Sequence, residues 1–188
     1  MSQSDLLKSL IEKLDGAGID YMITGSVASS LQGEPRLTHD IDVVVEITRD
    51  RIPAILDSFP APRYYVEEAA IIEAIETGGM FNVIDVVEGD KIDFWLLTRE
   101  PFDQSRFVRK CEEDVLGIHL KVSRPEDTIL VKLRWSRLSG GSEKYFIDAL
   151  RVFEVQSGHL DLDYLREWSS ALGLEDLHER MLAEATPR

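Results

Sequence analysis

Apolar positions in residues 1–122 follow two spacings, one typical of strands and one typical of helices. Between Ser4 and Gly16, apolar residues recur every three or four positions, which predicts an amphipathic helix that ends at the glycine. Short apolar runs rich in β-branched residues predict strands at residues 19–24, 40–46, 80–87 and 91–97. Further helices are expected at residues 27–31, 51–58, 66–77 and 102–110. Residues 115–122, which Gly117 interrupts, predict a hairpin or a single bent strand.

From Ser123 onward the spacing is helical throughout. The pattern Ser123-Arg124-Pro125-Glu126 is typical of a capping box at the start of a helix. Helices are expected at about residues 123–138, 142–155, 162–172 and 175–185. The sequence therefore predicts an α+β chain in two parts, with the strands in residues 1–122 and a helical part in residues 123–188.

Composition places the chain among globular proteins. Its 188 residues are 44% apolar, which is enough to build a hydrophobic core and excludes general disorder. The single cysteine, Cys111, cannot form an intrachain disulfide, and nothing points to an oxidising compartment. The first residues are amphipathic rather than signal-like, and no apolar run reaches the roughly 18 residues of a membrane span. We therefore expect a soluble, cytoplasmic protein with no membrane partner.

The chain is strongly acidic. Lys and Arg number 21 against 35 Asp and Glu, which gives a formal charge of −14. A protein that coats nucleic-acid phosphates needs the opposite sign, so a broad binder of that kind is excluded. Residues 101–140 differ from the rest, because 8 basic and 6 acidic residues give them a net charge of +2. Any local basic face is expected in that segment.

Three aspartates are candidates for a common functional site. Asp40 and Asp42 are two residues apart in a predicted strand, so their side chains leave the same face about 6–7 Å apart at the Cα level. Asp93 lies in a second predicted strand between apolar neighbours, where an acid is poorly placed for solvent. If the two strands are neighbours, the carboxylates converge and repel one another. Hard divalent cations such as Mg²⁺, which take oxygen ligands, resolve that conflict.

Other interpretations of these residues stay open. Asp40 and Asp42 alone are equally consistent with a turn or a solvated rim. Asp85 is a rival for the third acid, and we expect it to be a surface or supporting residue instead. The pair Gly25-Ser26 joins a strand to a short helix. Such a junction can offer backbone N–H groups to a phosphate, although a plain tight turn has the same sequence.

The order of these parts resembles the signature of the DNA polymerase β-type nucleotidyltransferase superfamily. That signature is a hydrophobic residue followed by Gly and Gly or Ser, then an acid–hydrophobic–acid strand, then a third acid on a later strand. The chain matches it at Ile23-Thr24-Gly25-Ser26, at Asp40-Ile41-Asp42 and at Ile92-Asp93-Phe94.

Finer features are similar to the minimal nucleotidyltransferases and the abortive-infection nucleotidyltransferase toxins. One is the spacing Arg36-x-Thr38-x-Asp40-x-Asp42. Another is a lysine on a C-terminal helix followed by a later aspartate, here Lys132 and Asp148. The resemblance implies a small mixed β-sheet that bears the three acids and is flanked by helices, followed by a C-terminal helical bundle.

The resemblance also implies an activity, the transfer of NMP from an NTP to an acceptor hydroxyl with release of pyrophosphate. The expected cofactor is Mg²⁺ or Mn²⁺, and the NTP is a co-substrate. The implied catalytic and metal-binding residues are Asp40, Asp42 and Asp93. The implied nucleotide-binding residues are Gly25, Ser26, Arg36, Thr38 and Lys132, with Asp148 as an accessory residue. An exposed helix lysine is the alternative interpretation of Lys132.

The acceptor and the biological setting stay open. A tRNA acceptor needs a local basic face, whereas a small-molecule hydroxyl or a residue of a partner protein fits the charge of −14 better. The resemblance suggests a toxin with an antitoxin partner, or a phage-defence component. The rival hypothesis is a nucleotide-binding or interaction module of the same fold without turnover. All three acids argue against that rival, because an inert module has no need for an electrostatically costly cluster.

Overall fold

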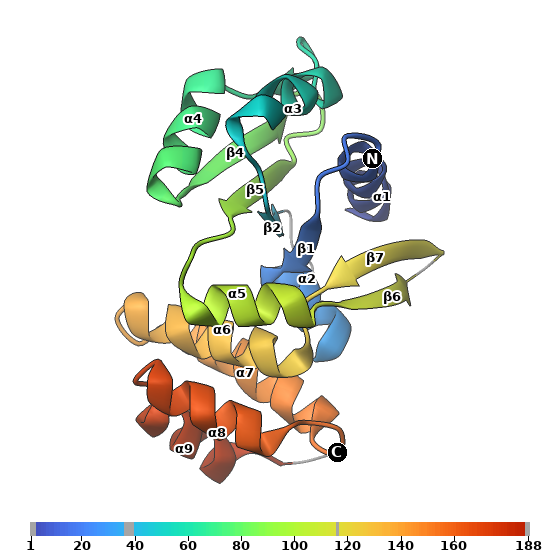
Figure 1. The fold of residues 1–188 in the computed structure, drawn as a ribbon. Helices are drawn as coiled ribbons and strands as arrows, with labels where there is room; N and C mark the ends of the chain where they lie inside the picture. The colour runs from blue at the N-terminus through green and yellow to red at the C-terminus, as the bar shows by residue number, and fades with distance from the viewer. Residues whose placement is uncertain (1–2, 36–39, 116, 187–188) are drawn as a thin grey trace. The chain divides into compact units, whose positions relative to one another are not determined.

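A computed structural model describes residues 3–35, 40–115 and 117–186. It has an α+β fold in which one sheet has the strand order β3-β4-β5-β2-β1-β7-β6 (Figure 1). The residues form two compact units. The first unit contains the sheet with α1 and α3–α5, and the second contains α2 and α6–α9. In the described part of the chain, no helix is long and apolar enough to cross a membrane.

The sheet is mixed, as expected. Strand β2 is parallel to β5, β1 is parallel to β7, and the remaining neighbours are antiparallel. The strands are β1 (Tyr21–Thr24), β2 (Asp40–Val45), β3 (Tyr64–Tyr65), β4 (Met80–Asp85), β5 (Lys91–Leu96), β6 (Cys111–Val115) and β7 (Ile118–Val122). The short strand β3 has no counterpart in the sequence prediction. The hairpin alternative for residues 115–122 is the correct one, but its first strand begins earlier, at Cys111.

The helices of the first unit lie close to their expected positions. They are α1 (Gln3–Gly16), α3 (Ile52–Ser58), α4 (Glu68–Thr77) and α5 (Pro101–Arg109), with a 3₁₀ turn at Arg49–Arg51. In Figure 1, α4 lies along β4 and β5, and α3 lies beside α4. Phe59, directly after α3, meets Phe94 of β5 edge-on at 5.8 Å, and Phe94 stacks on Phe81 of β4 at 4.8 Å. These buried rings fix which face of β4 and β5 is turned to the helices.

The opposite face of the sheet has an apolar part and, further along the same strands, an acidic part. Phe107 of α5 packs with Met22 and Val44, and the half-buried Trp95 and Leu97 join this cluster. Asp42 is two residues from Val44, and Asp93 is two residues from Trp95, so the same face continues into the acidic positions. The cluster around Phe107 therefore covers the part of this face that carries Val44 and Trp95, and Asp42 and Asp93 lie beside it.

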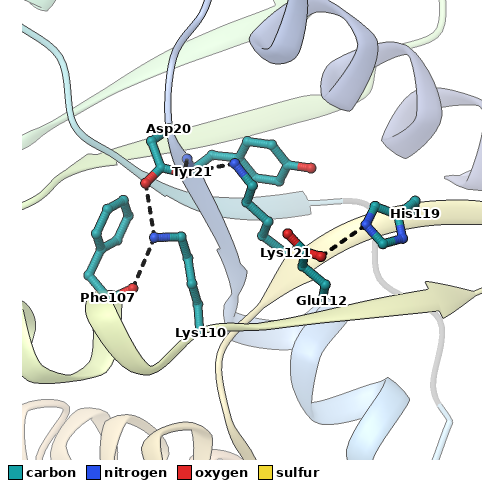
Figure 2. Close-up of polar contacts among 7 residues, drawn as sticks. All are labelled: Asp20, Tyr21, Phe107, Lys110, Glu112, His119 and Lys121. Carbon is teal, nitrogen blue, oxygen red and sulfur yellow. Dashed lines mark hydrogen bonds and ion pairs between the residues drawn. The ribbon is translucent and has the colours of Figure 1, made fainter.

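A lysine pair holds the start of β1. Figure 2 shows Lys110, which follows α5, and Lys121 of β7 converging on Asp20. Each ammonium lies 2.9 Å from a different carboxylate oxygen of Asp20. Lys110 also lies 3.8 Å from the centre of the Phe107 ring. Burial alone would raise the pKa of Asp20, but the hydrogen bonds from Lys121 and Lys110 lower it below its ordinary value of 3.8.

We expect Asp20→Asn to lower the free energy of unfolding at pH 7, because it removes the carboxylate that pairs with Lys110 and Lys121. The loss should be only about 1 kcal/mol, because this carboxylate is partly exposed. A lowered folded pKa stabilises the protein above the ordinary value, and that contribution is lost as the pH falls through the folded pKa. The difference between wild type and variant in urea unfolding should therefore shrink below pH 3.8. A constant difference at every pH would contradict this assignment.

The second unit is entirely helical in its described residues. Its helices are α2 (Gly25–Gln32), α6 (Pro125–Leu138), α7 (Glu143–Gln156), α8 (Leu162–Ala171) and α9 (Glu175–Glu184). The side-chain amide of Gln32 donates to the backbone carbonyl of Ser123 at 2.5 Å, and the backbone carbonyl of Gln32 accepts from the side-chain amide of Gln156 at 2.9 Å. A Cβ on Gly33 would lie 3.0 Å from the backbone nitrogen of Val152, so glycine allows this close approach.

Packing therefore groups α2 with the C-terminal helices, whereas the expected parts were residues 1–122 and 123–188. That division into domains stays a prediction. The expected capping box at Ser123 is wrong. The N-cap of α6 is Arg124 and makes no side-chain capping bond, while Glu126 accepts the backbone N–H of Asp161 at 2.9 Å. Glu126 is buried, and its carboxylate joins α6 to the start of α8 instead.

Candidate functional site

The three aspartates share one face of the sheet. Strands β2 and β5 are parallel neighbours, and their register places Asp42 directly beside Asp93 and Asp40 beside Lys91. Residues in register have side chains on the same face, and so do residues two apart in one strand. We call Asp40, Asp42, Lys91 and Asp93 the acid face. The condition set by the sequence, that the two strands be neighbours, is met, while the chemical roles of these residues stay predictions.

Asp93 is the buried member of the acid face. It is 8% exposed, whereas the side chain of Asp40 is 54% exposed. Lys91 donates to one oxygen of Asp93 at 2.9 Å, and the side-chain amide of Asn82 in β4 donates to the other. Both oxygens of this carboxylate therefore have a donor, which offsets the desolvation of a buried charge.

Lys91 also approaches Asp40, with 4.0 Å between its ammonium and the nearer carboxylate oxygen. Its hydrogen bond to Asp93 raises the pKa of Lys91 above its ordinary value of 10.5, against the opposing effect of burial. The charges of Asp93, Asp40 and Asp42 raise that pKa further. The indole N–H of Trp95 donates to Asp42 at 3.3 Å. One ammonium, one amide and one indole thus hold the three carboxylates.

The donor chemistry of the acid face fits a hard divalent cation. Asp40, Asp42 and Asp93 offer carboxylate oxygens from adjacent strands, the ligand type that Mg²⁺ and Mn²⁺ prefer. Within residues 3–35, 40–115 and 117–186, no three acidic, His or Cys side chains are already gathered tightly enough to hold a metal. A cation bound here would compete with the donors that already hold these carboxylates, Lys91, Asn82 and Trp95.

Asp85 is excluded from the acid face. It lies on the same face of β4 as Phe81 and Val83, so it points to the opposite side of the sheet from Asn82. The expectation of a surface residue is wrong, because Asp85 is 2% exposed and pairs with Arg63 at 2.9 Å. It does not support Asp93 either, because it lies on the other face of the sheet. Burial raises the pKa of Asp85, but the hydrogen bonds from Arg63 and two backbone N–H groups outweigh it and lower that pKa. Its role is to fix the turn between β4 and β5.

Thr24 contributes an unsatisfied hydroxyl. It is the register partner of Asp42 across β1 and β2, so its side chain lies on the same face. Thr24 is 5% exposed, and its hydroxyl has no hydrogen-bond partner within the described residues. A buried polar group without a partner costs stability, and such groups occur at functional positions.

We expect Thr24→Val to raise the free energy of unfolding by about 1 kcal/mol, because valine keeps the shape and removes the unpaired hydroxyl. Thr24→Ser is the matched control, since it keeps the hydroxyl and loses a methyl group, and it should lower stability. Urea unfolding of the metal-free protein measures both. A valine variant less stable than wild type would show that the hydroxyl has a partner in solution.

Gly25 and Ser26 begin α2, immediately after β1. Gly25 has φ +62°, a left-handed conformation that favours glycine at this sharp change of direction. The backbone N–H groups of a first helical turn are not used within the helix, so they suit an anion. Arg36 and Thr38, the other residues expected near the nucleotide, lie outside the described residues.

Lys132 and Asp148 form a buried ion pair inside the second unit. Lys132 of α6 lies 2.7 Å from the carboxylate of Asp148 in α7, and their side chains are 3% and 11% exposed. Lys132 also lies 5.5 Å from the centre of the Tyr145 ring. The alternative of an exposed helix lysine is therefore wrong. The structure pairs these two residues, while their part in nucleotide binding stays a prediction.

Structure comparison identifies the fold. ANT(2″)-Ia in complex with adenylyl-2″-tobramycin matches with a TM-score of 0.65 at 14% identity, over 92% of this chain and 97% of that one. The lincosamide antibiotic adenylyltransferase LnuA, with lincomycin bound, matches with a TM-score of 0.57 at 10% identity, over 82% and 98%. An antigenic nucleotidyltransferase-like protein from Paracoccidioides brasiliensis gives 0.52 at 18% identity, over 90% and 91%.

The chain has the nucleotidyltransferase fold. The resemblance seen in the sequence is thereby confirmed at the level of the fold. No protein-family model matches the sequence, and neither does any curated protein.

Sequence reasoning missed three side chains of the site in this nucleotidyltransferase fold. Lys91 and Trp95 lie two residues on either side of Asp93, so strand alternation alone could have placed them on its face. Asn82 lies opposite Asp93 in β4, a pairing that depends on the register of the hairpin. No local signal in the sequence reveals that register before the turn is known.

Proposed function

We propose that this protein is a metal-dependent nucleotidyltransferase that moves NMP from an NTP to an acceptor hydroxyl and releases pyrophosphate. The observation that carries the proposal is the pairing of Asp42 with Asp93 on adjacent parallel strands, with Asp40 on the same face. Three carboxylates on one face of the sheet, with Asp93 buried among them, support a catalytic role over an inert module. The nucleotidyltransferase fold of the chain agrees with this proposal.

Asp40, Asp42 and Asp93 would hold the Mg²⁺ or Mn²⁺ ions. Bound there, a divalent cation supplies Lewis-acid chemistry, because it neutralises phosphate charge and makes a hydroxyl easier to deprotonate. Asp93 assists by accepting the proton of the acceptor hydroxyl. The acceptor oxygen then bonds to the α-phosphorus as the bond to the pyrophosphate oxygen breaks.

The resemblance noted in the sequence also implies which residues would hold the rest of the nucleotide. Gly25 and Ser26 would bind the β- and γ-phosphates through backbone N–H groups and the serine hydroxyl. Lys132 would neutralise triphosphate charge, with Asp148 keeping its ammonium in position. Arg36 and Thr38 are proposed to shape the same site.

A small-molecule hydroxyl is the acceptor that the charges support best. At least five of the eight basic residues in 101–140 are already in ion pairs with acidic side chains, namely Arg106, Lys110, Lys121, Lys132 and Arg137. Their positive charge is largely neutralised, which argues against a basic face for tRNA. Two proteins of the same fold carry an adenylylated tobramycin and a lincomycin, both small molecules. A toxin or phage-defence role, an antitoxin partner and a cytoplasmic location stay predictions.

Transfer itself tests the proposal. The protein is incubated with Mg²⁺, each of the four NTPs labelled at the α-phosphate, and tobramycin, lincomycin or bulk tRNA as acceptor probes. We expect label to move to a small molecule with one NTP, pyrophosphate to appear in equal amount, and EDTA to stop both. Label on tRNA instead would overturn the choice of acceptor. If no NTP yields pyrophosphate with any probe, and none binds at millimolar concentration, the inert module is the better account.

A further inference from the structure

We propose that Lys91 is a built-in counter-cation of the acid face, which holds Asp40 and Asp93 in the metal-free protein and must leave them when a divalent cation binds. The inference rests on the proposed function, because it concerns the same carboxylates. It adds a positioning residue that competes with the metal.

The place of Lys91 in the sheet supports this role. It is the register partner of Asp40 and lies two residues before Asp93, so all three side chains share one face. Its ammonium is 2.9 Å from one carboxylate and 4.0 Å from the other. A single positive charge thus stands between two of the groups that a cation would need.

The hydrogen bonds of Asp93 show which of its carboxylate oxygens Lys91 would have to leave. Asn82 donates to Oδ1 and Lys91 donates to Oδ2. The Asn82 amide is neutral and can stay, because it fixes the carboxylate in the way that an outer-shell donor fixes a metal ligand. A divalent cation bound to Oδ2 would be repelled by the Lys91 ammonium, which now lies 2.9 Å from that oxygen. The hydrogen bond from Lys91 to Oδ2 is therefore the one that must break when the metal binds.

Exposure makes the release of Lys91 feasible. Its side chain is 38% exposed, so the ammonium can move from Asp93 into water, while the bound cation would take over the charge compensation of the buried carboxylate. Lys132 is the contrasting case within this protein, because its side chain is only 3% exposed and its ammonium is paired in the interior of its unit. Lys91 is therefore suited to a reversible contact, and Lys132 to a permanent one.

The inference predicts a gain of function in metal binding. Lys91→Met removes the competing charge and should lower the Kd for Mn²⁺ alone, without nucleotide, by about tenfold or more. In EDTA the same variant should melt at a lower temperature than wild type, because Asp40 and Asp93 lose their counter-charge. Added Mn²⁺ should raise its melting temperature more than it raises that of wild type.

Two variants serve as controls. Lys91→Arg keeps the positive charge and should bind Mn²⁺ no more tightly than wild type. Lys8→Met changes the net charge by the same amount at an exposed position of α1, and should alter neither quantity. Mn²⁺ binding is measured by electron paramagnetic resonance of the free ion. If Lys91→Met cannot be purified without metal, its melting temperature across a Mn²⁺ titration replaces the binding curve.

The outcomes separate this inference from the proposed function. In one outcome, wild type binds Mn²⁺, Asp42→Asn abolishes that binding, and Lys91→Met binds Mn²⁺ with the same or a higher Kd. That outcome overturns the role of Lys91 but supports the metal site. Absence of Mn²⁺ binding in both wild type and Lys91→Met overturns the inference together with the metal site. Tighter binding by Lys91→Met and not by Lys91→Arg is the result we expect.

Discussion

Asp42→Asn is expected to reduce nucleotidyl transfer by about 1,000-fold or more while the protein stays folded. Asp42 lies at the centre of the acid face, in register with both Asp93 and Thr24. Asparagine keeps the size of the side chain and can still accept the Trp95 hydrogen bond, but it loses the charge that a cation needs. The initial rate of pyrophosphate release with saturating NTP and Mg²⁺ measures the effect.

Glu46→Gln is the matched control for this substitution. Glu46 follows β2 directly and is exposed, so removing its charge should leave the rate within about twofold of wild type. The melting temperature of Asp42→Asn in EDTA should equal or exceed that of wild type, since one of three repelling carboxylates is gone. A variant that retains a tenth or more of the wild-type rate would exclude Asp42 as a metal ligand.

Asp148→Ala is expected to lower the free energy of unfolding by about 3 kcal/mol. The substitution removes the carboxylate that pairs with Lys132 and leaves an ammonium in a site where the lysine side chain is 3% exposed. Breaking one partner of such a pair is far more costly than replacing both by apolar groups. Urea unfolding followed by circular dichroism measures the loss.

The double variant Lys132→Met, Asp148→Leu separates the ion pair from simple packing. It should recover most of the stability lost in Asp148→Ala, because neither charge remains in the buried site. NTP binding by the double variant should stay weak, since the proposed phosphate-binding ammonium is missing. Strong NTP binding by this variant would show that Lys132 serves the fold alone. Equal stability of Asp148→Ala and wild type would show that the pair is dispensable.

Local spacing predicted the parts of this molecule that depend on periodicity. Alternation along residues 40–46 placed Asp40 and Asp42 on one face, and the apolar neighbours of Asp93 correctly indicated burial. The helices from α6 to α9 follow from their apolar spacing and the glycines between them. These features can be predicted because each depends only on residues that are near it in the sequence.

Features that depend on distant pairing could not be predicted in this way. Asn82 reaches Asp93 only because β4 and β5 pair in one register, and Lys132 is buried only because α6 meets α7. Asp85 was misplaced for a different reason. Its place on the same strand face as Phe81 and Val83 was visible in the sequence, but the pairing with Arg63, which allows a carboxylate to be buried on an apolar face, was not.

The most direct test of the account is a crystal structure of the protein grown with Mn²⁺ and a non-hydrolysable analogue of the NTP that it binds, with data recorded at the manganese absorption edge. The account predicts anomalous density at the carboxylates of Asp40, Asp42 and Asp93, the phosphates of the analogue beside it, and the Lys91 ammonium away from Asp93. Manganese and analogue bound elsewhere, with Lys91 still paired to Asp93, would contradict it.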